Sequence, residues 1–140
     1  MAAACTYVAE IGAGARSIVK MHQWTWVSSP DGTLTGLGTS DVISGRLIQM
    51  LAIPVSGSMP TSGYDLKLVD SNGFDWLIGV GANLPSSCDH VNNLQSPFIS
   101  LNQRPVVQNV TLTPVVSGAG DTKSAILRLW VGDIRKGAYV

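Results

Sequence analysis

Residues 64–81, with the sequence YDLKLVDSNGFDWLIGVG, predict two short β-strands joined by a tight turn. The first arm alternates between polar and apolar residues after Tyr64, a pattern typical of a half-buried strand. Ser71, Asn72 and Gly73 predict the turn, because Asn and Gly tolerate the positive φ that a tight hairpin requires. The second arm is more apolar, so we expect it to be the more buried of the two. The side chains of this arm expected in the interior are those of Phe74, Trp76 and Ile78.

Period-two alternation predicts further strands on both sides of this hairpin. Residues 17–27 place His22, Trp24 and Trp26 on one side of a strand, and residues 124–132 place four small or aliphatic side chains on one side. Both segments are rich in β-branched and aromatic residues, which favour strands. The segments expected to be strands are residues 17–27, 33–39, 42–55, 64–69, 74–80, 98–101, 106–116 and 124–132.

Residues 42–55, VISGRLIQMLAIPV, are apolar on both sides of the expected strand, with Leu47 and Met50 on opposite sides. This pattern indicates a central strand or one that contacts another subunit. A helix over residues 46–52 is the alternative, but the short length and the following Pro54 favour a strand.

The spacing of these segments suits an all-β fold, a single-domain antiparallel β-sandwich or jelly-roll-like barrel of about seven or eight strands. The pattern contains no long amphipathic helix, which argues against a βαβ fold. We expect residues 1–15 to be a flexible N-terminal arm, residues 16–132 to be the β-sandwich domain and residues 133–140 to be a C-terminal tail. Residues 82–97 are expected to form an irregular loop with a helical turn around residues 87–94.

Low charge is the main feature of the composition, since only 13% of the 140 residues are charged and the formal net charge is zero. Such a surface predicts a chain covered by a partner, most simply by copies of itself; a Thr-, Ser- and Asn-rich β surface is the alternative. The equal numbers of basic and acidic residues argue against nucleic-acid binding, which needs clustered Lys and Arg. No apolar run is long enough for a membrane-spanning helix, and the first residues make a poor signal peptide, so we expect synthesis and assembly in a cytoplasm.

Cys88, Asp89 and His90 are the nearest approach to a metal cluster. A structural zinc site needs four ligands at paired spacings, and neither Cys5 nor His22 lies at such a spacing. We therefore expect no metal, no other cofactor and two free thiols.

Asp70, Asn72 and Asp75 surround a glycine and so resemble a calcium-binding loop, but the glycine position and the missing glutamate do not fit an EF-hand. Turn capping by these side chains is the better interpretation. The only glutamate of the chain is Glu10, and no paired-carboxylate or nucleophile motif is present. The residues therefore predict a protein that is not an enzyme.

Trp24 and Trp26 share one side of a strand, as in sugar-binding modules with exposed aromatic side chains. Core packing and subunit interfaces use the same pattern, because Trp is enriched at interfaces. Because the chain has few charged residues, a place in the core or at a subunit interface is favoured over sugar binding for these two side chains. The interface candidates are Trp24, Trp26, Arg46, Ile48, Met50 and Trp130.

The segment 64–84, YDLKLVDSNGFDWLIGVGANL, resembles a pattern found in small structural proteins of tailed bacteriophages. That pattern is approximately Y-D-[IVL]-x-L-x-D-x-x-G-x-D-x-L-x-G-x-G-A-[ND]. An upstream W-x-W strand, an S-G-R-L-I segment and a late strand ending in L-W-V also match in order over residues 16–132. Phe74 and Trp76 are bulkier than this pattern has at their positions. The matching residues of the central segment are Tyr64, Asp65, Leu68, Asp70, Gly73, Asp75, Leu77, Gly79, Gly81, Ala82 and Asn83.

This resemblance implies a structural virion protein, assembled in the host cytoplasm and located in the capsid. The leading expectation is a capsid decoration, or cement, protein that forms a homotrimer and binds the major capsid protein. A head–tail connector or tail component is the first alternative, and a carbohydrate-binding module is the second.

Overall fold

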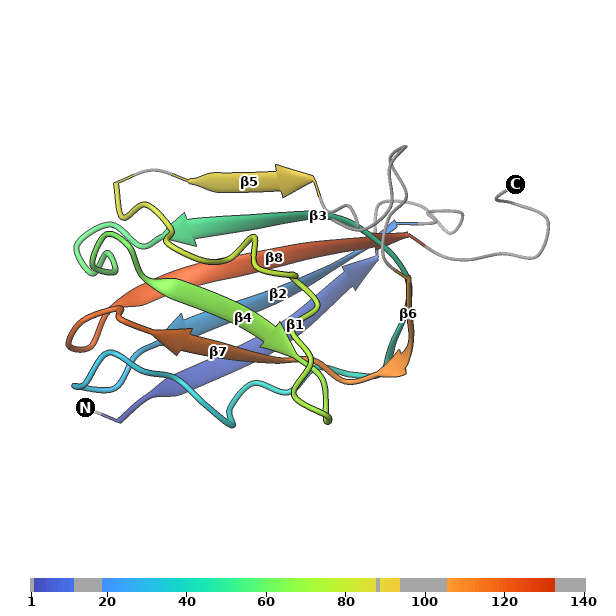
Figure 1. The fold of residues 1–140 in the computed structure, drawn as a ribbon, viewed down its shortest axis with the longest axis horizontal. Coiled ribbons are helices and arrows are strands. Elements are labelled where there is room, and N and C mark those ends of the chain that lie inside the picture. The colour runs from blue at the N-terminus through green and yellow to red at the C-terminus, as the bar shows by residue number, and fades with distance from the viewer. Residues whose placement is uncertain (1, 12–18, 88, 94–105, 133–140) are drawn as a thin grey trace.

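Eight β-strands form two antiparallel sheets in the computed structural model, which describes residues 2–11, 19–87, 89–93 and 106–132 (Figure 1). The predicted all-β class is confirmed. The strands are β1 (Ala4–Ile11), β2 (Val19–Val27), β3 (Ile43–Pro54), β4 (Asp65–Val69), β5 (His90–Asn93), β6 (Val106–Val110), β7 (Thr113–Ser117) and β8 (Ser124–Gly132).

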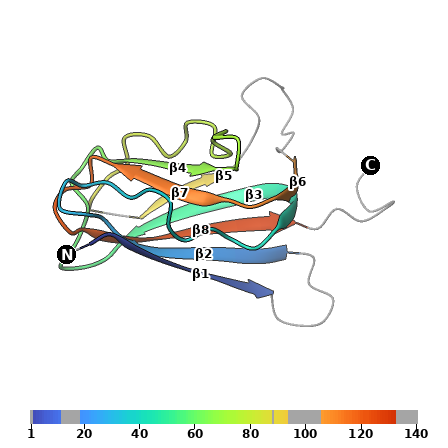
Figure 2. The same cartoon turned by 90° about the horizontal axis from the view of Figure 1, so that it is seen from below.

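The two sheets are stacked as layers of unequal size. The larger sheet has the order β1-β2-β8-β3-β5, and β6 pairs with the other end of β3. The smaller sheet contains β4 and β7. Figure 2 shows the β4–β7 layer on one side of the larger sheet and no strand on the other side. The larger sheet therefore has an inner face, covered by β4 and β7, and an outer face.

The core lies between the layers and is built from alternate residues of the central strands. Trp24 and Trp26 of β2 share one side of the strand, as the alternation in residues 17–27 predicts, and both are 0% exposed. Their neighbours on β8, Leu127 and Ala125, lie directly opposite them. Across the gap, β4 contributes its own inward side chains, and the loops close the ends. The buried side chains from the smaller layer and the loops include Leu34, Tyr64, Leu66, Leu68, Leu77, Leu84, Leu112 and Val116.

A β-bulge in β3 explains why residues 42–55 are apolar on both sides. The register of β3 against β8 shifts between Leu47, which pairs with Val131, and Gln49, which pairs with Trp130. The extra residue, Ile48, reverses the alternation, so that Leu47 and Met50 are both fully buried. The prediction that Leu47 and Met50 face opposite sides is wrong for this reason.

The predicted hairpin over residues 64–81 is wrong in its second arm. The strand β4 pairs along its length with β7, and the second arm returns to it only at a bridge between Val69 and Asp75. Residues 76–81 form consecutive turns and not a strand, and the amides of Ile78 and Val80 bond to the carbonyls of Asp75 and Leu77. Only Leu77 of residues 74–80 is buried, whereas Phe74 is 50% exposed.

The expected interior positions Trp76 and Ile78 are half-buried. The physical reason is the left-handed backbone at Ile78 (φ 53°) and Gly79 (φ 82°), which an extended strand cannot accommodate.

The N-terminal boundary of the domain also differs from the prediction. Residues expected in a flexible arm form β1, which pairs with β2 from Ala4↔Val27 to Ile11↔Lys20. The domain therefore extends at least to Ala4, and the predicted boundary at residue 16 is wrong.

Three smaller predictions are also corrected. Residues 33–39 contribute only a bridge between Leu34 and Val116, and residues 106–116 divide into β6 and β7. The described part of residues 87–94 ends in strand β5 rather than a helical turn. The predicted strand at residues 98–101 and the tail at residues 133–140 lie outside the described residues.

Replacing Gly73 with valine should destabilise the fold by about 1–3 kcal/mol, because Gly73 has φ +84° and β-branched residues are strained there. Nothing lies within 4 Å of the position that a Cβ atom would take, so the cost is conformational and not steric. Urea denaturation measures the change. Gly73→Asn is the matched control and should lose less stability than Gly73→Val, since Asn adopts a positive φ more readily. Equal losses of stability in the two variants would contradict the explanation.

Candidate functional site

The outer face of the larger sheet is the most extensive candidate surface in the described part of the chain. Its residues form rows across the strands, since paired residues in an antiparallel sheet point to the same side. In one row Met21 lies opposite Trp130, which lies opposite Gln49. The next rows contain Val8, Gln23, Arg128 and Leu51, and then Thr6, Thr25, Ile126 and Ile53. We call these residues of the outer sheet face the sheet patch.

Six of the eleven residues of the sheet patch are apolar although the patch is only partly covered. Met21, Leu51, Ile53, Ile126 and Trp130 are half-buried, because neighbouring side chains cover one another. Val8 is 50% exposed at the margin. Such a surface favours contact with a second macromolecule, since water contact with clustered apolar atoms is unfavourable.

One charged side chain lies in the centre of the sheet patch. Arg128 donates from Nε to Oε1 of Gln23 at 2.8 Å, along the row that also contains Val8 and Leu51. Arginine is enriched at protein interfaces, where its remaining donors can reach a partner.

The six interface candidates from the sequence divide into two groups. Trp24, Trp26 and Met50 are 0% exposed, so they pack inside the chain and the prediction that they face a partner is wrong. The reason is the β4–β7 layer, which covers the inner face. Arg46, Ile48 and Trp130 are half-buried, and Trp130 belongs to the sheet patch.

Sequence reasoning missed most of the sheet patch. Met21, Leu51, Ile53 and Ile126 were each visible as apolar residues on the second side of a strand. That signal was present, but the register that joins them across β2, β8 and β3 is a tertiary property.

Tyr7, His22 and Trp24 form a cluster on the inner face between β1 and β2. The Tyr7 hydroxyl and His22 Nδ1 are 2.6 Å apart, and their rings are stacked with 6.0 Å between centroids. The Tyr7 and Trp24 rings are 5.2 Å apart, and the Trp24 indole donates to the carbonyl of Gly38 at 2.7 Å. His22 is only 2% exposed, so a substrate could not reach it without opening the sheet.

Burial controls the protonation of this cluster. It lowers the pKa of His22 to about 4, with Lys20 lowering it further and Asp41 opposing the shift. It also raises the pKa of Tyr7 to about 12, with a contribution from Asp41. Both side chains are therefore neutral at neutral pH, which suits a packed hydrogen-bonded pair. Nearby, burial raises the pKa of the Cys5 thiol to about 11, so this cysteine is not a thiolate.

The carboxylates near residue 73 bind backbone amides. Asp70 Oδ1 accepts from the amides of Asn72 and Phe74 at 2.9 and 3.1 Å, and its Oδ2 accepts from the Trp76 indole at 3.0 Å. Burial raises the pKa of Asp70, but these bonds outweigh it, and the net pKa is lowered. The turn-capping interpretation is confirmed.

Asp75 also accepts hydrogen bonds from backbone amides. Its Oδ1 accepts from the amides of Leu68 and Leu77, and its Oδ2 accepts from the amide of Gly79. This carboxylate lines a groove of about 270 Å³ beside β4, together with Asp65 and Lys67. Asp65 also accepts a bond, from the amide of Asn83 at 2.8 Å, so both acids of the groove have structural partners.

No group of three or more His, Cys, Asp or Glu side chains that could hold a metal occurs in residues 2–11, 19–87, 89–93 and 106–132. Cys88, from the Cys-Asp-His segment, lies outside the described residues. The structure therefore does not test whether Cys88 pairs with Cys5. Within those same ranges, no helix has the length and apolar character needed to cross a membrane.

Comparisons with protein-family models, with curated proteins and with solved structures found no match.

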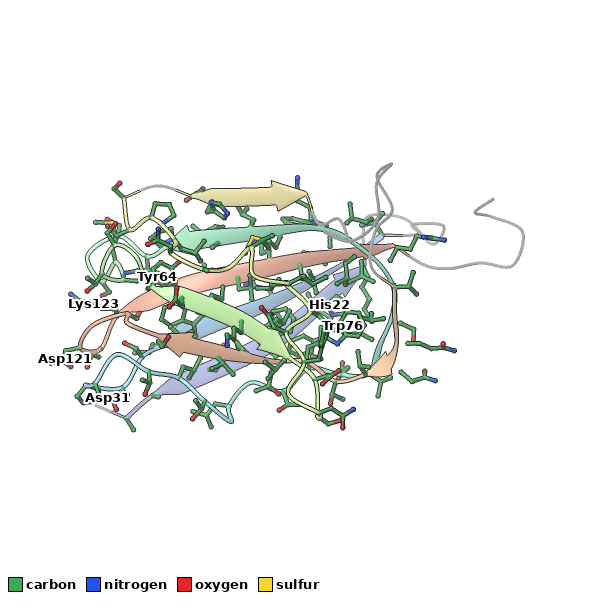
Figure 3. The ribbon with its side chains drawn as sticks, viewed as in Figure 1. His22, Asp31, Tyr64, Trp76, Asp121 and Lys123 are labelled. Carbon is green, nitrogen blue, oxygen red and sulfur yellow. The ribbon has the colours of Figure 1, made fainter. Side chains whose placement is uncertain are left out.

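Tyr64 and Tyr7 give opposite predictions for removal of a hydroxyl. The Tyr64 hydroxyl is buried with no hydrogen-bond partner in the described structure, and the Tyr7 hydroxyl bonds to His22 (Figure 3 labels Tyr64 and His22). Tyr64→Phe should therefore raise the free energy of unfolding by about 1 kcal/mol, and Tyr7→Phe should lower it by about as much. Urea denaturation of both variants tests this, and destabilisation by Tyr64→Phe would contradict it.

The fold should lose stability as the pH falls from about 6.5 to about 4. The folded pKa of His22 is about 4 and its ordinary value is 6.5, so the unfolded chain binds more protons in this window. His22→Gln should reduce the difference in unfolding free energy between about pH 7 and about pH 5. His90→Gln, which removes the only other histidine, is the control. A pH dependence unchanged by His22→Gln would refute the assignment.

Proposed function

We propose that this chain is a structural virion protein of a tailed bacteriophage, a capsid decoration protein that binds the assembled head and stabilises it. The proposal rests on the resemblance of residues 64–84 to phage structural proteins and on the sheet patch. The major capsid protein is the proposed partner, and the chain is proposed to act as a homo-oligomer, for which the resemblance implies a trimer.

The sheet patch is the observation that carries the proposal. It is broad, because it spans β1, β2, β8 and β3, and it is formed by regular strands rather than by loops. Regular strands hold their side chains in fixed positions, so binding costs little ordering of the surface. An apolar patch with a central arginine suits a stable protein contact better than recognition of a small molecule.

The proposed mechanism is stabilisation by selective binding. A protein that binds assembled capsid subunits, and binds separated subunits weakly, adds its binding free energy to the stability of the shell. Contact with two neighbouring capsid subunits would give this selectivity. The mechanism needs a rigid scaffold and a contact surface, and it requires no chemical step.

A head–tail connector or tail component is the second candidate, since the same sheet patch could contact those proteins. The carbohydrate-binding alternative relied on exposed Trp24 and Trp26 side chains. Both are 0% exposed and cannot stack on a sugar, so the structure gives this alternative no support.

Trp130→Lys should weaken head binding at least tenfold, because it places a charge in the apolar sheet patch. The test uses heads of the phage that encodes this chain, prepared without it, and measures co-sedimentation and the temperature at which the heads release DNA. Wild-type protein should bind and raise that temperature. Met59→Lys is the matched control, because Met59 is 45% exposed on a loop outside the sheet patch.

The folded state of each variant is checked by its melting temperature before binding is measured. Equal binding by Trp130→Lys and wild type would exclude the sheet patch as the contact. Absence of wild-type binding to heads, with binding to purified tails, would replace the lead proposal by the second candidate.

A further inference from the structure

The edges of the two sheets are protected unequally. Next to β4, the amide of Trp76 bonds to the carbonyl of Leu68, and the amide of Leu66 bonds to the carbonyl of Gly81. Next to β7, Leu34 and Val116 exchange both backbone bonds. The opposite end of the larger sheet is formed by β5 and β6, which pair with β3. The edges of β4 and β7 therefore have partners within the chain.

The outer edge of β1 has no such cover in the described part of the chain. Strand β1 is at the end of the sheet order, and among the described residues no backbone bond from outside the ladder reaches it. It is eight residues long and pairs with β2 without a register shift. Its sequence, ACTYVAEI, has no proline or lysine, two residues that often protect an edge strand from pairing. A regular edge of this kind binds another extended strand through its free amides and carbonyls.

The core beneath β1 is also incompletely covered. The inward side chains of β2, Trp24 and Trp26, are 0% exposed, whereas the inward Cys5 and Tyr7 of β1 are only half-buried. These two side chains pack against the core cluster from its margin. The apolar interior thus continues to the free edge and stops there, where a further strand would extend its cover.

We propose that β1 pairs antiparallel with β1 of a second copy of this chain, about a two-fold axis normal to the sheet. Residues that face each other must lie on the same side of the sheet, so the central register pairs Tyr7 with itself or Val8 with itself.

This contact deepens the proposed function and rests on the self-association that it includes. The two-fold axis leaves both β4–β7 layers on one side and joins the two sheet patches on the other. A single continuous surface would then meet the capsid, and simultaneous binding of two patches increases the overall affinity. An isologous contact closes with two copies, or with six where a three-fold contact also exists, and it does not by itself give a trimer.

Charge substitutions at Val8 test the contact. Val8 lies on the outer face and is 50% exposed, so Val8→Lys should leave the melting temperature of the subunit almost unchanged. In the dimer, the two residues at position 8 lie next to the axis in either register. Val8→Lys and Val8→Glu should each weaken dimerisation at least tenfold by like-charge repulsion, and an equimolar mixture should form a heterodimer.

Native mass spectrometry measures the oligomers, and hydrogen exchange locates the contact. Alternate amides of β1 should exchange slowly in the wild-type dimer and rapidly in Val8→Lys. Met59→Lys, outside both the edge and the sheet patch, should dimerise as wild type does. A monomer at all concentrations, or a trimer that is unaffected by the Val8 variants, would overturn the proposal.

The failure of this inference can be separated from the failure of the proposed function. Wild-type protein that binds heads but forms no detectable dimer would overturn β1 pairing and leave the decoration role intact. A wild-type dimer that is disrupted by Val8→Lys supports β1 pairing, even if neither protein binds heads.

Discussion

Burial of Trp24 and Trp26 beneath the β4–β7 layer is the constraint on which the rest of the structure depends. Their two-residue spacing puts both indoles on the inner face, where they lie opposite Leu127 and Ala125. The Trp24 indole also bonds to the carbonyl of Gly38, which fixes the following loop above β1. A Cβ atom at Gly38 would lie 2.3 Å from Sγ of Cys5, so only glycine permits this close approach. Two large side chains thereby contact Tyr64, which precedes β4, and the loop at Gly38.

The bulge at Ile48 makes this core compatible with an apolar outer face. By reversing the alternation of β3, it directs Leu47 and Met50 inward and leaves Leu51 and Ile53 on the outer side with Ile126 and Trp130. A regular strand would have placed Met50 outside. The same local irregularity therefore completes the core and gives the sheet patch its apolar character. Stability and the proposed contact surface have a common structural origin.

The sheet patch and the β1 edge form a joined pair of surfaces, because Val8 belongs to both. Pairing at the edge would bring two patches together, and head binding would hold the paired copies in place. The buried Tyr7–His22 pair lies on the inner side of the same strand and supports its position against β2. Strand β1, which the sequence suggested was a flexible arm, is thus central to the proposed assembly.

The sequence by itself determined the all-β class, which residues of β2 and of β8 share a side of the strand, and the turn at Asn72-Gly73. These features depend on local rules: period-two alternation, and the backbone freedom of Asn and Gly. Only the tertiary structure decided that β4 pairs with β7, that residues 76–81 form turns, and that Trp24 and Trp26 are core rather than interface. Alternation assigns a residue to a side of its strand. Which side is covered, and which strands are neighbours, depends on pairings between segments distant in the sequence, and no local pattern contains that information.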